Sequence, residues 1–465
     1  MKGGASAARP LGGRAILRNW GAPAAAFCVS AAAMGVTTHQ IDPAAIAARG
    51  AVLLPGPKRA LKQALAQSDD TAVADIYRQR GYQPLWTDAQ GIDATGKALL
   101  IILRGAAADG LDPRRYAVPA RLEGGEDAAA SRARLDLALT HAFLAYVRDL
   151  HRPAAADAMA YADPALSPDR EWHRVAGLLG SRPSPIPALG EALRMHPLYR
   201  TLRASLAATR SAAAPDAKRE ALLLANMDRL RALPADPGAR YILVDTASAQ
   251  LWMIDHGRPA GSMRVVVGKQ RLPTPALAGV MRYAVRNPYW NVPPDLVRER
   301  GRRALAQGPG FLAAERIELL SSWAESAQVL PPAEVDWRAV ADGQQDLRMR
   351  QLPGAGNMMG SIKFALPNPL GIYLHDTPDK DLFRGSDRRR SSGCVRVEDA
   401  DRLARWLFDG RVPPATGASE QRIELPAAVP VFIIYLTALP VDGTIAIYPD
   451  SYRRDPAVPV RRRTV

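Results

Sequence analysis

The pattern of apolar residues changes character at Arg240, and this change constrains the fold more than any other feature of the chain. Upstream, apolar side chains recur at helical spacing, as in Leu139, Phe143 and Val147, which lie four positions apart. Downstream, short β-branched runs separated by turn signals predict strands, beginning with 241–244. The sequence therefore predicts an α+β protein, in which a mainly helical N-terminal region is followed by a mostly β region.

Further strand signals follow at intervals, and two helical segments interrupt them. The signals lie at 250–254, 263–267, 281–285, 361–364, 372–374, 431–436 and 444–448, with an Asp-Gly turn at 442–443 before the last run. One helical insertion is predicted from about 293 to 338, and one amphipathic helix at about 398–408. With 465 residues, the chain has room for about three domains of ordinary size.

These patterns divide the chain into consecutive segments. We expect a helical region at 61–235 and a mostly β region at 240–455, and the insertion with its flanks spans about 290–350. A linker rich in Ala, Pro and Gly is expected at 39–60, and a basic tail at 456–465.

The first 38 residues predict export from the cytoplasm. Lys2, Arg9, Arg14 and Arg18, with no acid among them, precede an apolar, alanine-rich run at 20–36. The run is short for a stable membrane span. We therefore expect a signal peptide and a location in the periplasm or cell envelope. The alternatives are an uncleaved anchor that holds the protein at the membrane, or a disordered tail.

The charge of the chain predicts attraction to polyanions. There are 61 Lys and Arg residues against 46 Asp and Glu residues, a formal net charge of +15. Nucleic acid, anionic lipid and a carboxylate-rich cell wall would all be attracted. The expected export, and the absence of a zinc-ligand or RNA-binding signature, argue against a nucleic-acid partner.

Cysteine usage leaves one thiol of interest. The chain has only Cys28, inside the apolar N-terminal run, and Cys394. After cleavage of a signal peptide, Cys394 would be the only cysteine and could form no internal disulfide. It is then buried and inert, paired with another chain, or reactive.

A histidine near Cys394 favours the reactive alternative. His375 ends a predicted strand 19 residues before Cys394, and the polar stretch between them is long enough to loop back. A neighbouring imidazole can take the proton of a thiol and activate it as a nucleophile. Gly393 would let backbone N–H groups approach a developing oxyanion. We also expect Cys394 to open the following helix, whose N-terminus would favour the thiolate.

Arg396 adds a positive charge beside the predicted nucleophile. Its guanidinium could hold a substrate carboxylate by two parallel hydrogen bonds, or it could only anchor the loop. No metal or other cofactor is expected. None of the seven histidines lies at metal-ligand spacing, and the chain has no phosphate-binding loop motif.

These residues carry a resemblance to a known family. His375-x-Thr377 followed by Ser391-x-Gly393-Cys394-x-Arg resembles the active-site signature of the YkuD-type L,D-transpeptidases. The segments 240–267, 287–294, 354–377 and 442–455 resemble other parts of that catalytic domain, and 77–116 resembles the helical scaffold of its large Gram-negative members. The resemblance implies a scaffold domain at 61–235 and a YkuD-like catalytic domain at 240–455, with the insertion as a helical lid.

The chain departs from the family pattern at two places. Many relatives have a histidine where this chain has Ser392. Large members often carry a peptidoglycan-binding module between scaffold and catalytic domain, but here only about 15 residues join the helical runs 199–210 and 226–234. We therefore expect no such module between the two regions.

The resemblance implies an acyltransferase of cell-wall biogenesis, with consequences for cell shape. Cys394 would attack a tetrapeptide stem of peptidoglycan, releasing D-Ala and leaving a thioester. An amine of a neighbouring stem would resolve the thioester to form a 3-3 cross-link. Carbapenem-type β-lactams are the inhibitors that the resemblance implies.

The resemblance also suggests roles for further residues. The backbone carbonyl of Asp376, or its carboxylate, would orient His375. Tyr373 would contact the oxyanion or the substrate, or pack in the core. Substrate-binding candidates are Arg396, Ser392 and Trp290, although an aromatic residue such as Trp290 can equally pack in the core.

Three other functions use the same observations. An L,D-carboxypeptidase, or a hydrolase that detaches wall-linked proteins, would need the same Cys and His and differ only in the acceptor. A catalytically inactive wall-binding scaffold is the third, and the intact Cys394 and His375 argue against it.

Overall fold

The computed structural model describes residues 55–119, 127–153, 159–214, 216–324 and 326–456. The predicted signal peptide at 1–38, most of the predicted linker and nearly all of the basic tail lie outside these residues. No helix within the described residues is both long and apolar enough to cross a membrane.

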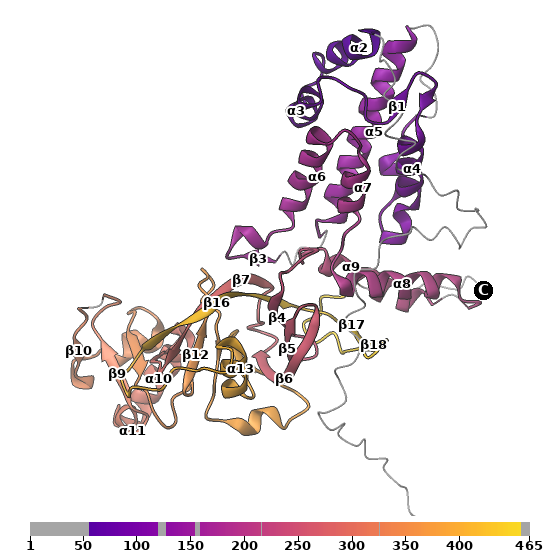
Figure 1. Ribbon diagram of the computed structural model, residues 1–465. Coiled ribbons are helices and arrows are strands. Elements are labelled where there is room, and N and C mark those ends of the chain that lie inside the picture. The colour runs from indigo at the N-terminus through magenta and orange to yellow at the C-terminus, as the bar shows by residue number, and fades with distance from the viewer. Residues whose placement is uncertain (1–54, 120–126, 154–158, 215, 325, 457–465) are drawn as a thin grey trace, which may run out of the picture.

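The N-terminal half is helical, as the sequence predicts (Figure 1). Aspartates cap several of these helices: Asp70, Asp93, Asp127 and Asp216 each accept a hydrogen bond from a backbone N–H of the first turn. The helices are α2 (Pro55–Leu65), α3 (Thr71–Gln79), α4 (Ala94–Arg104), α5 (Ala128–Leu150), α6 (Asp169–Ser181), α7 (Ile186–Ala192), α8 (Pro197–Ser211) and α9 (Ala217–Leu230). Short elements between them are β1 (Thr87–Asp88), β2 (Gly91–Ile92), η2 (Gly105–Asp109), η3 (Pro113–Tyr116), β3 (Ala160–Tyr161) and η4 (Pro164–Leu166).

The predicted linker at 39–60 extends too far. Helix α2 already begins at Pro55, and Leu61 within it is buried. Proline is well tolerated in the first turn of a helix, because the N–H that it lacks would have no partner there. Pro55, which suggests a linker in the sequence, therefore begins helix α2.

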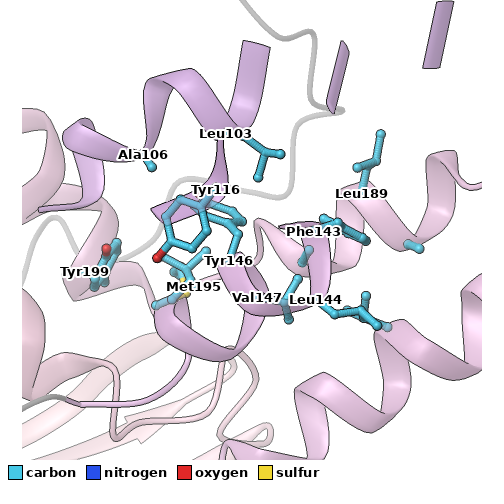
Figure 2. Packing of buried hydrophobic residues seen from close by; sticks show 14 of the residues in the cluster. Leu103, Ala106, Tyr116, Phe143, Leu144, Tyr146, Val147, Leu189, Met195 and Tyr199 are labelled. Carbon is cyan, nitrogen blue, oxygen red and sulfur yellow. The ribbon is translucent and has the colours of Figure 1, made fainter. Parts of the chain in front are cut away.

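Helix α5 is the centre of the helical half. Leu139, Phe143 and Val147 are fully buried on it, which confirms the predicted apolar face. Figure 2 shows Phe143 and Val147 among the buried side chains of this region. Asp136, also fully buried on α5, accepts hydrogen bonds from the Tyr77 hydroxyl at 2.5 Å and the Trp86 N–H at 2.9 Å. These bonds give the buried carboxyl group of Asp136 the hydrogen-bond partners that a polar group needs inside the core.

The C-terminal half is a closed ring of strands around its own core. The strands are β4 (Arg240–Asp245), β5 (Gln250–Asp255), β6 (Arg258–Gly268), β7 (Leu277–Arg286), β12 (Ile362–Ala365), β13 (Leu374–His375), β15 (Val395–Val397) and β16 (Gln421–Ile434). Their order is β12-β13-β15-β6-β5-β4-β16-β7, and β12 also pairs with β7, which closes the ring. Strand β3 pairs with β7, and β14 (Arg389–Ser391) pairs with β6.

Alternate residues of each strand point to opposite faces of the sheet. On β4, Ile242 and Val244 face the core of the ring, where helix α13 (Ala400–Leu407) also packs. Tyr241 and Leu243 face the other way, into the core of the helical half.

The helical half and the ring of strands share this core. Asn226 and Arg229 of α9 also reach the ring by polar contacts, with Asn226 Nδ2 at 2.9 Å from Thr437 Oγ1 and Arg229 Nη1 at 2.7 Å from Asp455 Oδ1. A hairpin of β17 (Ala438–Val441) and β18 (Thr444–Ile447) lies beside α8 and α9. The Asp-Gly turn at 442–443 connects these two strands, at the place the sequence predicts.

The insertion contains helices, but it also has a sheet that the sequence did not reveal. Its elements are β8 (Trp290–Asn291), α10 (Pro294–Gln307), α11 (Phe311–Ala314), β9 (Ile317–Leu320), β10 (Val329–Leu330), η5 (Pro332–Glu334), α12 (Trp337–Asp342) and β11 (Arg348–Gln351). The four strands pair in the order β10-β9-β11-β8 around a separate apolar core. Strands of two to four residues are too short to show the alternation that predicts a strand.

Candidate active site

Two short parallel strands bring the predicted nucleophile and base together. In the register of β13 and β15, Leu374 is opposite Val395 and His375 is opposite Arg396. Leu374 and Val395 belong to the core of the ring. His375 and Arg396 therefore point outward, and so does Cys394, two positions before Arg396. The outer face of the ring thus carries all three side chains.

Strand β12 adds a lysine to this face. Lys363 is opposite His375 in the antiparallel pairing of β12 and β13. Its Nζ lies 5.2 Å from the centre of the Tyr373 ring and 4.0 Å from Glu420 Oε2. Tyr373 thus lies on the outer face beside Cys394 rather than in the core. Sequence reasoning missed Lys363, although a lysine between Ile362 and Phe364 in a strand marks a solvent-side position.

His375 is oriented by a backbone carbonyl. Only 4% of the residue is exposed, and Nδ1 lies 2.6 Å from the carbonyl oxygen of Asp376. The oxygen can only accept, so Nδ1 carries the proton and Nε2 has the free lone pair. The Asp376 carboxylate is bound elsewhere, accepting from the Ser361 N–H at 2.9 Å and from Lys380 Nζ at 2.7 Å. The sequence left open whether the backbone carbonyl or the carboxylate of Asp376 orients His375, and in the structure it is the carbonyl.

Burial favours the neutral forms of both the thiol and the imidazole. Burial first, and the charge of Arg396 second, lower the pKa of His375 to about 4. Burial raises the pKa of the Cys394 thiol, against the opposing effects of a hydrogen bond at the Tyr373 backbone and the charges of Arg396 and Lys363. The half-buried Cys394 Sγ lies 3.6 Å from the carbonyl oxygen of Gly371. Burial of the two groups therefore disfavours a preformed thiolate–imidazolium pair.

The prediction that Cys394 opens a helix is wrong. Cys394 leads directly into strand β15, and α13 begins only at Ala400, with Asp399 as its cap. The three residues of β15 pair between β13 and β6, which holds them extended. The N-terminus of α13 therefore does not lie at the thiol, and Arg396 and Lys363 are positive side chains that act on it.

The turn before Cys394 is held by hydroxyl groups. Gly393 has φ +123°, a conformation that side chains other than hydrogen rarely allow. Its N–H donates to Ser391 Oγ at 3.1 Å, and this hydroxyl donates to the carbonyl of Cys394 at 2.6 Å. The Thr274 hydroxyl donates to the carbonyl of Gly393 at 2.7 Å. The Gly393 N–H is thus used within the turn, and sequence reasoning assigned no role to Ser391 or Thr274.

Arg396 is the cation nearest the nucleophile in sequence, and it is half-buried. Within the described residues its guanidinium forms no ion pair with a carboxylate, and its buried Nε has no hydrogen-bond partner. The carboxylate of Asp379 acts on Arg396 electrostatically without forming an ion pair, so the guanidinium keeps hydrogen-bond donors that could bind a substrate carboxylate.

The substrate-binding roles expected for Ser392 and Trp290 stay predictions. Ser392 is exposed, next to the buried Ser391. Trp290 packs against the core of the insertion, and its ring centre lies 5.3 Å from the Arg300 guanidinium. Among the described residues, no three His, Cys, Asp or Glu side chains are grouped so that they could hold a metal ion.

Two family models match the chain. The model described as the L,D-transpeptidase catalytic domain, YkuD, matches residues 239–426, and the one described as the Scaffold domain matches residues 71–206. A candidate L,D-transpeptidase of Haemophilus influenzae is 33% identical over 240 residues, covering 50% of this chain and 48% of the relative. The chain thus matches about half the length of this curated relative.

Solved structures of low sequence identity are also similar in part. An L,D-transpeptidase from Mycobacterium smegmatis is 13% identical, with a TM-score of 0.20, and the match covers 42% of this chain and 58% of that one. An L,D-transpeptidase in complex with imipenem is 12% identical, with a TM-score of 0.20 and the same coverage of 42% and 58%.

Proposed function

Because this chain carries an L,D-transpeptidase catalytic domain of the YkuD family together with a Scaffold domain, we propose that it cross-links peptidoglycan. The donor is a tetrapeptide stem and the acceptor is an amine of a neighbouring stem. The observation that supports this most directly is the outer face of β13 and β15, which carries Cys394, His375 and Arg396 together.

The first half of the reaction acylates the enzyme. Sγ of Cys394 attacks the carbonyl carbon between the third and fourth stem residues while Nε2 of His375 takes the thiol proton. The carbonyl oxygen becomes an oxyanion. The backbone N–H of Cys394 would donate a hydrogen bond to it. The C–N bond then breaks, D-Ala leaves with the proton from His375, and a thioester remains.

The second half forms the cross-link. The amine of the acceptor stem attacks the thioester carbonyl and gives its proton to Nε2 of His375. The C–S bond breaks, the sulfur takes back this proton, and the new amide leaves. Because His375 starts neutral, with its pKa lowered to about 4, it can accept a proton in both halves.

Positive groups at the site suit an anionic donor. Arg396 forms no ion pair with a carboxylate among the described residues, and Lys363 lies beside Tyr373 on the same face. Stem peptides carry carboxylates, which a guanidinium binds with two parallel hydrogen bonds. The formal net charge of +15 favours the encounter with an anionic cell wall.

The test is incubation with purified tetrapeptide muropeptides, followed by mass spectrometry. We expect cross-linked dimers with loss of D-Ala, and none with Cys394→Ala. Tripeptide products without dimers would replace the proposal with an L,D-carboxypeptidase, since water would then be the acceptor. A carbapenem should add its intact mass to Cys394 and a penicillin should do so poorly.

We also propose that the protein works in the periplasm or cell envelope, because the basic and apolar start of the sequence is typical of an export signal. Cell fractionation with N-terminal sequencing tests this. We expect the periplasmic fraction to contain a protein that begins near residue 38. An intact N-terminus in the membrane fraction would mean that the segment is an anchor. Recovery from the cytoplasm would contradict export.

A further inference from the structure

The loop between β6 and β7 folds back over the last residue of β6. A Cβ atom on Gly268 would lie 2.2 Å from the carbonyl oxygen of Leu272 and 2.5 Å from the backbone nitrogen of Thr274. Only glycine permits this close approach. The consequence is that Thr274, which is 1% exposed, is pressed against the end of β6.

The Thr274 hydroxyl joins two segments that are far apart in sequence. It accepts a hydrogen bond from the Gly268 N–H at 2.8 Å and donates one to the Gly393 carbonyl at 2.7 Å. The hydroxyl thus acts as both acceptor and donor, and the bond that it donates ends on the peptide group that precedes Cys394.

Among the described residues, Ser391 bonds the two flanking groups, the Gly393 N–H and the Cys394 carbonyl, and Thr274 bonds the Gly393–Cys394 peptide group itself. With φ at +123°, Gly393 lies in a region open to glycine, where backbone rotation meets little steric resistance. A trans peptide is planar, and its C=O and N–H point in opposite directions. Holding the Gly393 carbonyl toward Thr274 therefore turns the N–H of Cys394 away from Thr274.

We propose that Thr274 is a positioning residue for Cys394, which orients the Cys394 N–H to stabilise the oxyanion formed during acylation. The inference rests on the proposed function for the identity of that reaction. Thr274 touches neither the substrate nor the reacting atoms, and it acts through the Gly393–Cys394 peptide.

Tyr452 supports the same place, since its hydroxyl interacts with both Gly268 and Thr274. The Tyr452 hydroxyl donates to the Gly268 carbonyl at 2.6 Å, and burial raises the pKa of Tyr452, so the hydroxyl keeps its proton. The Tyr452 ring stacks on Tyr435 at 5.2 Å, and the guanidinium of Arg229 on helix α9 lies 5.2 Å from the same Tyr435 ring. Contacts therefore run from the scaffold helix α9 to the peptide beside the nucleophile.

Two reactions of Cys394 separate this role from a purely structural one. Alkylation by iodoacetamide forms no oxyanion, whereas acylation by a carbapenem or an activated ester does. Thr274→Val keeps the shape of the side chain and removes the hydroxyl. We expect roughly tenfold or more slower acylation, less than the 10²–10³ that loss of a whole oxyanion donor costs, with alkylation unchanged. Thr274→Ser should restore most of the acylation rate.

The matched control is Thr140→Val, which removes a buried hydroxyl far from the site, where it accepts from Trp86 Nε1 at 2.9 Å. It should lower the melting temperature and leave the ratio of the two rates unchanged. If Thr274→Val slows both reactions equally, or neither, the proposal is overturned.

If Thr274→Val does not fold, the same two reactions are compared in Tyr452→Phe. We expect acylation to be a few-fold slower and alkylation unchanged. An unchanged ratio of the acylation rate to the alkylation rate would overturn the proposal. Failure of the wild-type protein to cross-link muropeptides, with acylation still sensitive to Thr274, would remove the proposed function and leave the positioning role.

Discussion

At the scale of single residues, burial favours a neutral thiol and a neutral imidazole over an ion pair. His375 is buried, and its Nδ1 is bound to a carbonyl, which leaves Nε2 as the only atom that can take the thiol proton. The sequence predicts Cys394 and His375 from their motif. It does not predict Thr274 or Lys363, because their roles arise from contacts across the chain, which no local pattern encodes.

The pH dependence of acylation should report this neutral pair. The pKa of His375 is lowered to about 4, below the usual value of about 6.5 for histidine, so the imidazole stays unprotonated as the pH falls toward 5. We expect the carbapenem acylation rate to hold between about pH 7 and pH 5 and to fall as the pH approaches 4. A rate that halves near pH 6.5 would contradict this.

Replacing the base should change that profile. With His375→Ala only the spontaneous thiolate reacts, and burial raises the pKa of the Cys394 thiol, so the residual rate should climb with pH beyond about 8.5. Stopped-flow acylation over a pH series measures this. The exposed His256, replaced by Ala, is the control, and a His375→Ala profile like that of the wild type would exclude His375 as the base.

Arg396 can be tested for substrate binding against mere anchoring. If it binds a donor carboxylate, Arg396→Ala should raise the donor KM by roughly ten- to a hundredfold, the range for a hydrogen bond to a charged group. Arg396→Lys should recover only part, because lysine lacks the planar fork. Arg384→Ala, an exposed arginine in the preceding loop, is the control. A lower melting temperature with normal KM would leave only an anchoring role.

At the scale of elements, long helices and strands were predictable and short ones were not. The apolar face of α5 and the strands β4 to β6 follow from local periodicity. The four-stranded sheet of the insertion does not, since its strands have two to four residues. Helix α13 lies where the amphipathic pattern at about 398–408 predicts it, but Cys394 does not open it, because pairing with β13 and β6 keeps residues 395–397 extended.

The loop between β6 and β7 should tolerate no side chain at Gly268. A Cβ there would meet the backbone of 272–274, which cannot rotate away as a side chain can. We expect Gly268→Ala to cost about 1–3 kcal/mol in the free energy of unfolding and to slow acylation, because the loop carries Thr274. Denaturant titration and acylation kinetics measure both. Gly190→Ala, with open space around it in α7, is the control, and equal stability in the two variants would contradict the crowding.

At the scale of the whole molecule, the two halves behave as one folded unit. Tyr241 and Leu243 on β4 and Phe432 on β16 belong to the same apolar cluster as the scaffold helices. The sequence predicts a change of region near residues 235–240, but not this shared core, since the contacts join segments far apart in the chain.

Thermal unfolding should therefore show a single transition. Arg229, 9% exposed, joins α9 to Asp455, and removing one partner of a buried ion pair costs about 3–5 kcal/mol. We expect Arg229→Ala to lower the melting temperature of the one transition by several degrees. Calorimetry checks this, with Arg78→Ala, at an exposed ion pair, as the control. Two separate transitions in the wild type would contradict a shared core.

The position of Tyr452 in the chain has a consequence for the timing of activity. A ribosome releases residues in order, so the Cys394 thiol is made before Tyr452, whose hydroxyl supports Gly268, and before Asp455, which pairs with Arg229. A nascent chain therefore holds its reactive sulfur without the completed support around it. We therefore expect acylation to reach its full rate only after residues 452–455 have been made and have packed against Gly268 and Arg229.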